Sequence, residues 1–453
     1  MVLISTVTLS VRSFVVAVPL VVFLAACATH APAPHAAARS ASVADPAVEA
    51  PPAESNGQDG DDVAAKASPT PTPRNAAGFA DWVAGFRARA AARGVDATTL
   101  NAAFDDAEYL PRVVELDNRQ PEFNRAIWDY LDTAVSATRV TNGRAKLAAH
   151  RSAADDAERR YGVPGNIITA IWGMESNYGA NFGHYETIDA LATLGYDGRR
   201  QSFAENQLYA AMKILSNGDI PRDRMRGSWA GAMGNTQFIP TSFVAYAVDA
   251  DGDGRRDIWG SIPDTMASTA NYLAKNGWRA GQSWGREVRL PADFDYSQAD
   301  GDTRQSSAAW ATAGVRPIDD RSLPDLANAG ILAPAGAAGP AFMVGHNYRV
   351  ILRYNNATAY ALGVALLSDR IDGEPGVQAA WPRDTAVLSN SQTRALQRQL
   401  NALGYGAGTP DGIMGPNTRS ALRRFQRDRG LPADGFATQD LLQAVTEAAG
   451  RTY

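Results

Sequence analysis

Helical spacing of apolar residues runs from Phe79 to about residue 280 and restricts the fold of this chain more than any other feature. Apolar residues recur there every three or four positions, which is the spacing of one helix face. Examples are FADWVAGFRARAAARG, QSFAENQLYAAMKILSNG and DTMASTANYLAKNGW. Strand-like alternation is scarce, and we expect it only in REVRL and NYRVILRY. The pattern predicts a mainly α fold.

A carboxylate stands at the end of one strongly apolar helix. Residues 126–162 read as two helices, and Pro164 suits the first position of the next, where its missing N–H costs nothing. That helix ends in GMESNYG, which places Glu175 where the pattern predicts burial. Burial raises the pKa of a carboxyl, so that it can hold a proton near neutral pH. Glu175 is therefore a candidate general acid, with a salt-bridge partner or an exposed charge as the ordinary alternatives.

Charge and motif content exclude several classes of function. The net charge of −5 argues against a nucleic-acid binder, which usually has a basic patch. The sequence has no Gly-rich phosphate loop and no His-Glu-x-x-His. Its five His residues do not cluster at metal-ligand spacing. We expect no nucleic-acid partner, no organic cofactor and no zinc peptidase chemistry.

The N-terminus has the pattern of an export signal. Arg12 is the only charged side chain before Arg39, and it precedes the apolar segment SFVVAVPLVVFLAAC, which is too short for an ordinary membrane span. The segment ends in LAAC and resembles the bacterial lipobox, where a peptidase cuts before the Cys and the thiol is lipidated. Cys27 is the only Cys, so the chain has no internal disulfide. A plain secretory signal with a chance Cys is the alternative.

Composition divides the rest of the chain. After the signal peptide (1–27), residues 28–75 are rich in Ala and Pro and lack aromatic residues, which predicts a disordered tether. Residues 76–375 form a first folded unit, within which 285–345 are rich in Ala, Gly and Pro and are expected to be looser. A linker (376–386) and a small separate unit (387–453) follow. At 453 residues the chain is long enough for two or three domains.

The small C-terminal unit resembles the peptidoglycan-binding domain of many cell-wall hydrolases, a three-helix module. The resemblance lies in LQRQLNALGYGAGTPDGIMGPNTRSALRRFQRDRGLPADGF, with the turns Asp411-Gly412 and Asp434-Gly435. Leu396, Leu400 and Leu403 share one helical face, as a packed core requires. An unrelated helical bundle is the alternative. The resemblance implies glycan strands of peptidoglycan as the partner.

The motif GMESNYG resembles the catalytic motif of the lytic murein transglycosylases of the membrane-bound type B family. The resemblance runs from about Phe79 to Asp372 and includes GSWAGAMGNTQFIPTSF and RYNNATAYALGV. It implies a lysozyme-like catalytic domain over 76–375, with an elaborated α/β subdomain. By resemblance, Glu175 is the single acid and base. The residues implied to bind or orient substrate are Tyr130, Ser228, Gln237, Phe238, Tyr354 and Asn355.

The implied reaction cleaves the MurNAc-GlcNAc β-1,4 bond and forms 1,6-anhydroMurNAc. Ordinary glycosidases use two carboxylates, whereas this reaction needs one, because the muramoyl C6 hydroxyl attacks within the same sugar. The sequence leaves a second carboxylate open, with candidates at Glu186, Asp189, Asp197 and Glu205. A hydrolytic muramidase and a non-catalytic wall-binding scaffold are the alternatives. Ala28 after the Cys favours, by resemblance to bacterial sorting rules, the periplasmic face of the outer membrane.

The segment DADGDGRRDIW resembles an EF-hand-like calcium loop. Asp249, Asp251 and Asp253 occupy positions 1, 3 and 5, and Arg255 offers its carbonyl at position 7. Position 12 is a Gly instead of the usual bidentate Glu. By resemblance to the family's own loop, Asp264 is the expected closing ligand. We expect structural Ca²⁺ here, with a solvated Asp-Gly turn as the alternative.

Overall fold

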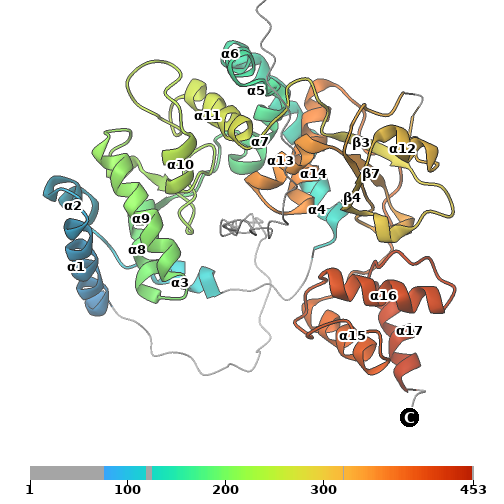
Figure 1. Cartoon of the computed structure of the whole chain (residues 1–453). Coiled ribbons are helices and arrows are strands. Elements are labelled where there is room, and N and C mark those ends of the chain that lie inside the picture. Colours follow the sequence, from blue (N-terminus) through green and yellow to red (C-terminus); the bar gives the residue numbers. More distant parts are fainter. Residues whose placement is uncertain (1–75, 119–124, 320, 451–453) are drawn as a thin grey trace, which may run out of the picture. The chain divides into compact units, whose positions relative to one another are not determined.

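The computed structural model describes residues 76–118, 125–319 and 321–450 (Figure 1). The predicted signal peptide with Cys27 and the predicted tether lie outside the described residues. The helices up to the end of the first folded unit are α1 (Ala76–Ala92), α2 (Ala97–Phe104), α3 (Pro111–Asn118), α4 (Ile127–Ala134), α5 (Ala137–Ala149), α6 (Arg151–Tyr161), α7 (Gly165–Ser176), α8 (Thr187–Asp197), α9 (Gln201–Ser216), α10 (Pro240–Tyr246), α11 (Ile262–Lys275), α12 (Ser307–Thr312), α13 (His346–Tyr354) and α14 (Thr358–Asp372). The prediction of a mainly α fold is confirmed.

Two hydrophobic cores organise these helices. One joins α1, α2, α8 and α9 and includes Phe86 and Leu208, both fully buried. The other surrounds α7, which packs against α5, α6, α11 and α14. Helix α7 supplies Ile171 and Trp172 to this core, and α14 supplies Leu362. The helix that ends in Glu175 is therefore covered on most sides, as its apolar sequence predicts.

Helix boundaries differ from the prediction at three places. Residues 126–162 form three helices (α4, α5 and α6), because Val135 and His150 have non-helical backbone angles that interrupt the run. Helix α7 begins at Gly165, one residue after Pro164, which is its N-cap. The segment NYRVILRY lies in α13 and is not a strand. Its buried residues Tyr348 and Val350 are used on a helix face, so tertiary packing overrides the strand preference of its composition.

The segment expected to be looser is an ordered antiparallel sheet with its own core. Its strands are β3 (Gly285–Arg289), β4 (Asp300–Gln305), β5 (Arg316–Pro317), β6 (Ala329–Leu332) and β7 (Ala341–Val344), in the spatial order β4-β6-β7-β3-β5. Strand β3 confirms the alternation of REVRL. Val288, Ile331 and Met343 pack with Trp310 of α12. A separate short pair joins β1 (Tyr185–Glu186) and β2 (Arg226–Gly227).

The C-terminal unit has the three expected helices, α15 (Asn390–Ala402), α16 (Pro416–Asp428) and α17 (Gln439–Gly450). Two Gln side chains fix its two Asp-Gly turns in the same way. Gln397 accepts from the N–H of Gly412 at 2.9 Å and donates to Asp411 at 2.9 Å. Gln426 accepts from the N–H of Gly435 at 2.8 Å and donates to Asp434 at 2.7 Å. The turns are therefore two copies of one arrangement.

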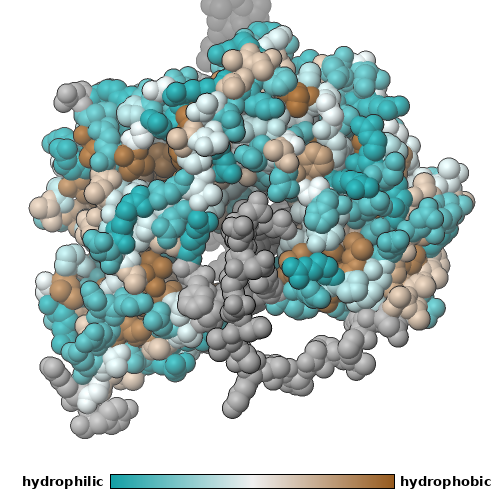
Figure 2. Space-filling model, turned by 180° about the vertical axis from the view of Figure 1, so that it is seen from behind, coloured by the Kyte–Doolittle hydropathy of each residue, from teal (hydrophilic) through white to brown (hydrophobic). Residues whose placement is uncertain are grey.

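Across residues 76–118, 125–319 and 321–450, no helix has the length and apolar character needed to cross a bilayer. Figure 2 shows a mainly hydrophilic face on which hydrophobic residues form small, separate patches. The large hydrophobic side chains exposed in the described chain are Ile413 and Leu431, both in the C-terminal unit.

Candidate active site

The end of α7 holds Glu175 in a tightly constructed turn. Asn177 and Tyr178, which follow the helix, both have left-handed backbone angles, with φ of 48° and 60°. The ring of Tyr178 folds back over the helix at Gly173, where a Cβ would lie 2.5 Å from it. The Tyr178 hydroxyl donates to the carbonyl of Arg139 at 2.8 Å. Only glycine leaves room for this return, so the local sequence fixes where the last turn of α7 ends.

The Glu175 carboxyl has the properties of a general acid. Burial raises its pKa to about 7, and a hydrogen bond from the Tyr360 hydroxyl to Oε1 acts in the opposite direction. Protein surrounds the carboxyl although Glu175 keeps a little accessible surface, so it is both poorly solvated and within reach of a ligand. Such a carboxyl carries its proton near neutral pH and has a donor ready for the charged form.

Four tyrosines gather around Glu175 from distant parts of the chain. Tyr130 (α4), Tyr272 (α11), Tyr354 (α13) and Tyr360 (α14) each have a raised pKa, caused first by burial and further by the charge of Glu175. Figure 1 shows α4, α7, α13 and α14 in one group. The structure thus brings the predicted Tyr130 and Tyr354 to the acid. It also adds Tyr360, whose only sequence signal was its place in the motif of Tyr354, and Tyr272, which had none.

The segment with Gln237 and Phe238 supports this tyrosine cluster. Gln237 has a left-handed φ of 50°, and its side-chain amide donates to the carbonyls of Phe182 and Gly234 at 3.0 and 2.9 Å. Phe238 is 2% exposed and packs against Tyr354, with ring centroids 5.9 Å apart. Phe238 therefore supports the ring of Tyr354, and the sugar contact that the resemblance implied for it stays a prediction.

Ser228 and Asn355 are placed differently from the tyrosines. The Ser228 hydroxyl accepts from the N–H groups of Ala230 and Ala232 at 3.3 and 3.2 Å. Bonds of this kind stabilise a turn. Asn355 follows Tyr354 directly and ends α13. Within the described residues, no contact joins either side chain to the Glu175 carboxyl.

Three of the four candidates for a second catalytic carboxylate are paired with arginines. Glu186 and Asp189 both bind Arg222, and Glu205 binds Arg89 at 2.8 Å. Asp197 ends α8. The shift in the pKa of Glu175 has two causes, burial and Tyr360, and no charged group of the described chain contributes to it. The arrangement supports chemistry with one carboxylate.

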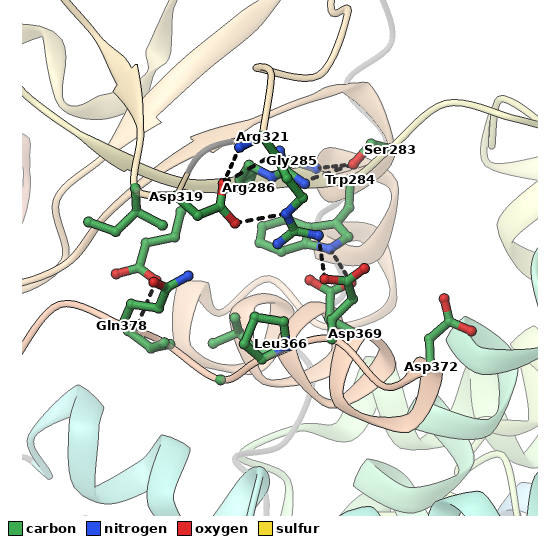
Figure 3. Close-up of a pocket in the computed structure, with 16 residues that line it drawn as sticks. Ser283, Trp284, Gly285, Arg286, Asp319, Arg321, Leu366, Asp369, Asp372 and Gln378 are labelled. Carbon is green, nitrogen blue, oxygen red and sulfur yellow. Dashed lines mark hydrogen bonds and ion pairs between the residues drawn. The ribbon is translucent and has the colours of Figure 1, made fainter.

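A second buried carboxyl shows why a raised pKa alone does not identify the acid. Asp369 lines a cavity between β3 and α14 (Figure 3). Burial raises its pKa to about 7, while the Trp284 indole donates to it at 3.0 Å. The arginines of this cavity are occupied, since Arg321 binds Asp319 at 2.8 Å and Arg286 donates to the Ser322 carbonyl at 2.6 Å. None of the predicted substrate residues lines this cavity, whereas two of them, Tyr130 and Tyr354, lie around Glu175.

The acidic loop brings together three of its predicted ligands. Asp249, Asp251 and Asp264 each offer a carboxylate oxygen, and these oxygens lie within 4.8 Å of one another. Ligands on opposite sides of Ca²⁺ are about that far apart, because Ca–O bonds measure roughly 2.4 Å. Asp253 does not join them, and its carboxylate accepts from the N–H of Arg255 at 2.9 Å. The hard oxygen donors and their spacing fit Ca²⁺, with Asp264 in the closing position.

Comparisons with known proteins fall on the same two regions. The sequence pattern described as "Transglycosylase SLT domain" matches residues 78–369, and the one described as "Putative peptidoglycan binding domain" matches residues 389–445. The chain is 31% identical to membrane-bound lytic murein transglycosylase B of Escherichia coli, over 294 residues that cover 61% of this chain and 79% of that protein.

Solved structures resemble the fold closely. SltB3 of Pseudomonas aeruginosa, in complex with NAG-anhNAM-pentapeptide, is 51% identical, with a TM-score of 0.79 over 81% of this chain and 99% of that chain. The Escherichia coli lytic transglycosylase SLT35, in complex with calcium, is 29% identical, with a TM-score of 0.55 over 66% of this chain and 93% of that chain. The first similarity extends across most of the described residues.

Proposed function

Because this chain belongs to the transglycosylase SLT family and is a lytic transglycosylase of peptidoglycan, we propose that Glu175 alone supplies both the acid and the base of its reaction. The observation that carries this proposal is the desolvated Glu175 carboxyl, with its raised pKa and its hydrogen bond from Tyr360. The site has the properties that each half of the reaction requires.

In the first half, protonated Glu175 gives its proton to the oxygen that links MurNAc C1 to GlcNAc. The C1–O bond breaks, and the GlcNAc side leaves with a new hydroxyl. Glu175 is then a carboxylate, which the Tyr360 hydroxyl stabilises by donating to Oε1. Since burial disfavours that charge, the carboxylate is a ready base for the next proton.

In the second half, Glu175 takes the proton of the muramoyl C6 hydroxyl, and the C6 oxygen bonds to C1. The product is 1,6-anhydroMurNAc, and the acid has recovered its proton without consuming water. The attack is intramolecular, so it has a large advantage in effective concentration over solvent. Tyr130 and Tyr354, which lie around the acid, offer aromatic surface to the sugars.

Mass spectrometry of digested peptidoglycan tests the bond and the second half. The proposal expects anhydro-MurNAc ends and their loss with Glu175→Gln. Reducing MurNAc ends would instead show that water completes the reaction, as in the hydrolytic muramidase alternative, while Glu175 remained the acid.

We also propose that Cys27 is acylated and ties the enzyme to the periplasmic face of the outer membrane, through the 28–75 tether. The lipobox resemblance and the relative described as membrane-bound support this. Cys27→Ser is expected to move the exported protein from the membrane fraction to the soluble periplasmic fraction, with unchanged activity on purified peptidoglycan. If the variant stays in the membrane fraction, Cys27 is not the anchor.

We propose that Asp249, Asp251 and Asp264 bind a structural Ca²⁺, supported by their converging oxygens and by the calcium complex of SLT35. Asp253, predicted as a ligand from the loop pattern, does not converge with these three carboxylates and is left out of the proposal, while the Arg255 carbonyl stays a prediction. The ion would neutralise three carboxylates, and Glu175 would work without it. At saturating calcium, chelation is expected to lower Tm by about 5 °C, because a ligand that binds only the folded state stabilises that state.

Asp251→Ala is expected to abolish the response of Tm to chelation. Asp253→Ala is the matched comparison within the same loop, and it should keep most of the response, because the Asp253 carboxylate lies outside the converging group. A wild-type melting curve that is unchanged by EDTA would reject the calcium site.

A further inference from the structure

Asn235 connects the catalytic helix to the end of the acidic loop. It is 2% exposed and uses every polar atom of its side chain. Its Oδ1 accepts from the indole N–H of Trp172 at 2.9 Å. Its Nδ2 donates to the carbonyls of Ile258 and Trp259, both at 3.0 Å. The orientation of the amide is unambiguous, because an indole N–H only donates and carbonyls only accept.

The backbone of Asn235 also connects the end of α7 to the end of the acidic loop. Its carbonyl accepts from the Ser176 hydroxyl at 3.0 Å, and its N–H donates to the Ile258 carbonyl at 2.9 Å. Ser176 follows Glu175 directly, and Trp172 precedes it by three residues, so both contacts fall in the last turn of α7. Two bonds therefore hold the turn that carries the acid, and three hold the loop.

The space around the Asn235 amide is closely fitted. A Cβ on Gly179, in the turn after α7, would lie 2.5 Å from Oδ1. On the loop side, Asp257 donates its N–H to Asp264 at 2.8 Å and accepts from the N–H of Trp259 at 2.8 Å. A continuous series of hydrogen bonds thus runs from the acidic loop through Asn235 to the turn of Glu175.

We propose that Asn235 is a positioning residue, which fixes the Glu175 carboxyl relative to Tyr360 by joining the last turn of α7 to the end of the acidic loop. The inference rests on Glu175 as the acid. Glu175 itself makes no contact with Asn235, so the effect passes through Trp172 and Ser176. A displaced turn would change both the distance to Tyr360 and the solvation of the carboxyl. The consequence is a change in proton transfer with little change in substrate binding.

Two substitutions separate the two sides of the connection. Asn235→Asp keeps an acceptor for Trp172 but loses both donors to the loop. Trp172→Phe keeps a ring in the core but loses the donor to Oδ1. Each is expected to lower kcat on soluble glycan fragments about tenfold, with KM nearly unchanged, which is the size of effect seen along coupled networks. Each should also shift the alkaline limb of the kcat–pH profile, where Glu175 loses its proton.

The double variant and a control decide between positioning and simple packing. If both substitutions break one connection, the double variant should lose little more than either single variant. Asn347→Asp is the control, because Asn347 is also fully buried and bonds the carbonyls of Arg279 and Gln282 at 2.9 and 2.7 Å. It should lower Tm to a similar degree while leaving the pH profile in place.

The inference is overturned if Asn235→Asp changes only Tm, as the control does, or if the losses in the double variant multiply fully. Should Asn235→Asp not fold, Trp172→Phe alone must still shift the alkaline limb. Activity of Glu175→Gln is measured beside these variants. An active Glu175→Gln would refute the assignment of the acid, which is a different result from an Asn235 variant with a normal profile.

Discussion

Glu175→Gln is expected to lower turnover of peptidoglycan by about 10³-fold or more, because the amide can neither donate the proton nor accept it back. The substitution keeps the size of the side chain, and the Gln oxygen can still accept from Tyr360. The loss should therefore appear in kcat. Glu205→Gln is the comparison, since Glu205 is paired with Arg89 and should leave turnover unchanged. Retained activity in Glu175→Gln would mean that another group is the acid or that the protein serves as a scaffold.

The same variant is expected to be more stable than wild type at alkaline pH. The pKa of Glu175 rises from an ordinary 4.5 to about 7 on folding. Below pH 4.5 the group is protonated in both states and makes no difference. As the pH rises toward 7 and beyond, the unfolded state ionises more easily, so Glu175 destabilises the fold by on the order of 1–3 kcal/mol. Tm measured at pH 8 should rise in Glu175→Gln, and Tm at pH 4 should not.

Tyr360→Phe is expected to lower kcat by about 10- to 100-fold, which is the worth of a hydrogen bond to a charged group. The ring remains, but the carboxylate formed after bond cleavage loses its donor. Because the bond from Tyr360 lowers the pKa of Glu175, its removal should move the alkaline limb of the kcat–pH profile to higher pH. The test is a pH profile of the variant at saturating substrate.

Tyr348→Phe provides the control for this prediction. Tyr348 is buried on α13, and its hydroxyl donates to the Thr358 carbonyl at 3.4 Å, away from Glu175. Loss of the Tyr348 hydroxyl should leave the alkaline limb of the kcat–pH profile unchanged. A limb that stays put or moves to lower pH in Tyr360→Phe would show that Tyr360 does not hold the catalytic carboxylate.

The local sequence pattern was enough to predict Glu175 as the candidate acid, but it did not predict the groups that contact Glu175 or its helix. An apolar helix that ends in GMESNYG predicts a buried Glu175, and in the structure the residue is half-buried, with a carboxyl that is desolvated enough to raise its pKa. Tyr360 lies 185 residues further along the chain, so no spacing rule connects the two. The role proposed for Asn235 could not be predicted from the sequence for the same reason. It depends on five hydrogen bonds to residues of two separate segments.

The sequence also did not predict in which direction the side chains of the acidic loop point. The loop spacing places Asp249, Asp251 and Asp253 as an alternating set, yet only Asp249 and Asp251 converge with Asp264, while all three accept from backbone N–H groups of the loop. Short-range bonds of this kind are a habit of Asp in turns. The prediction of a strand at NYRVILRY was wrong for a different reason. The β-branched and aromatic residues of this segment suit a strand or a buried helix face equally well.

The C-terminal unit contains two Asp-Gly turns of the same construction, so the residues that follow the two turns can be compared directly. Gln397 and Gln426 each hold one of these turns, by donating to its Asp and accepting from the N–H of its Gly. Ile413 follows the first turn and is 66% exposed, whereas Phe436 follows the second and is mostly covered. The backbone geometry is thus held constant while the side chain beside it is free to diverge. Two copies of one turn can in this way present unlike surfaces, one exposed to solvent and one covered by hydrophobic side chains such as Trp128.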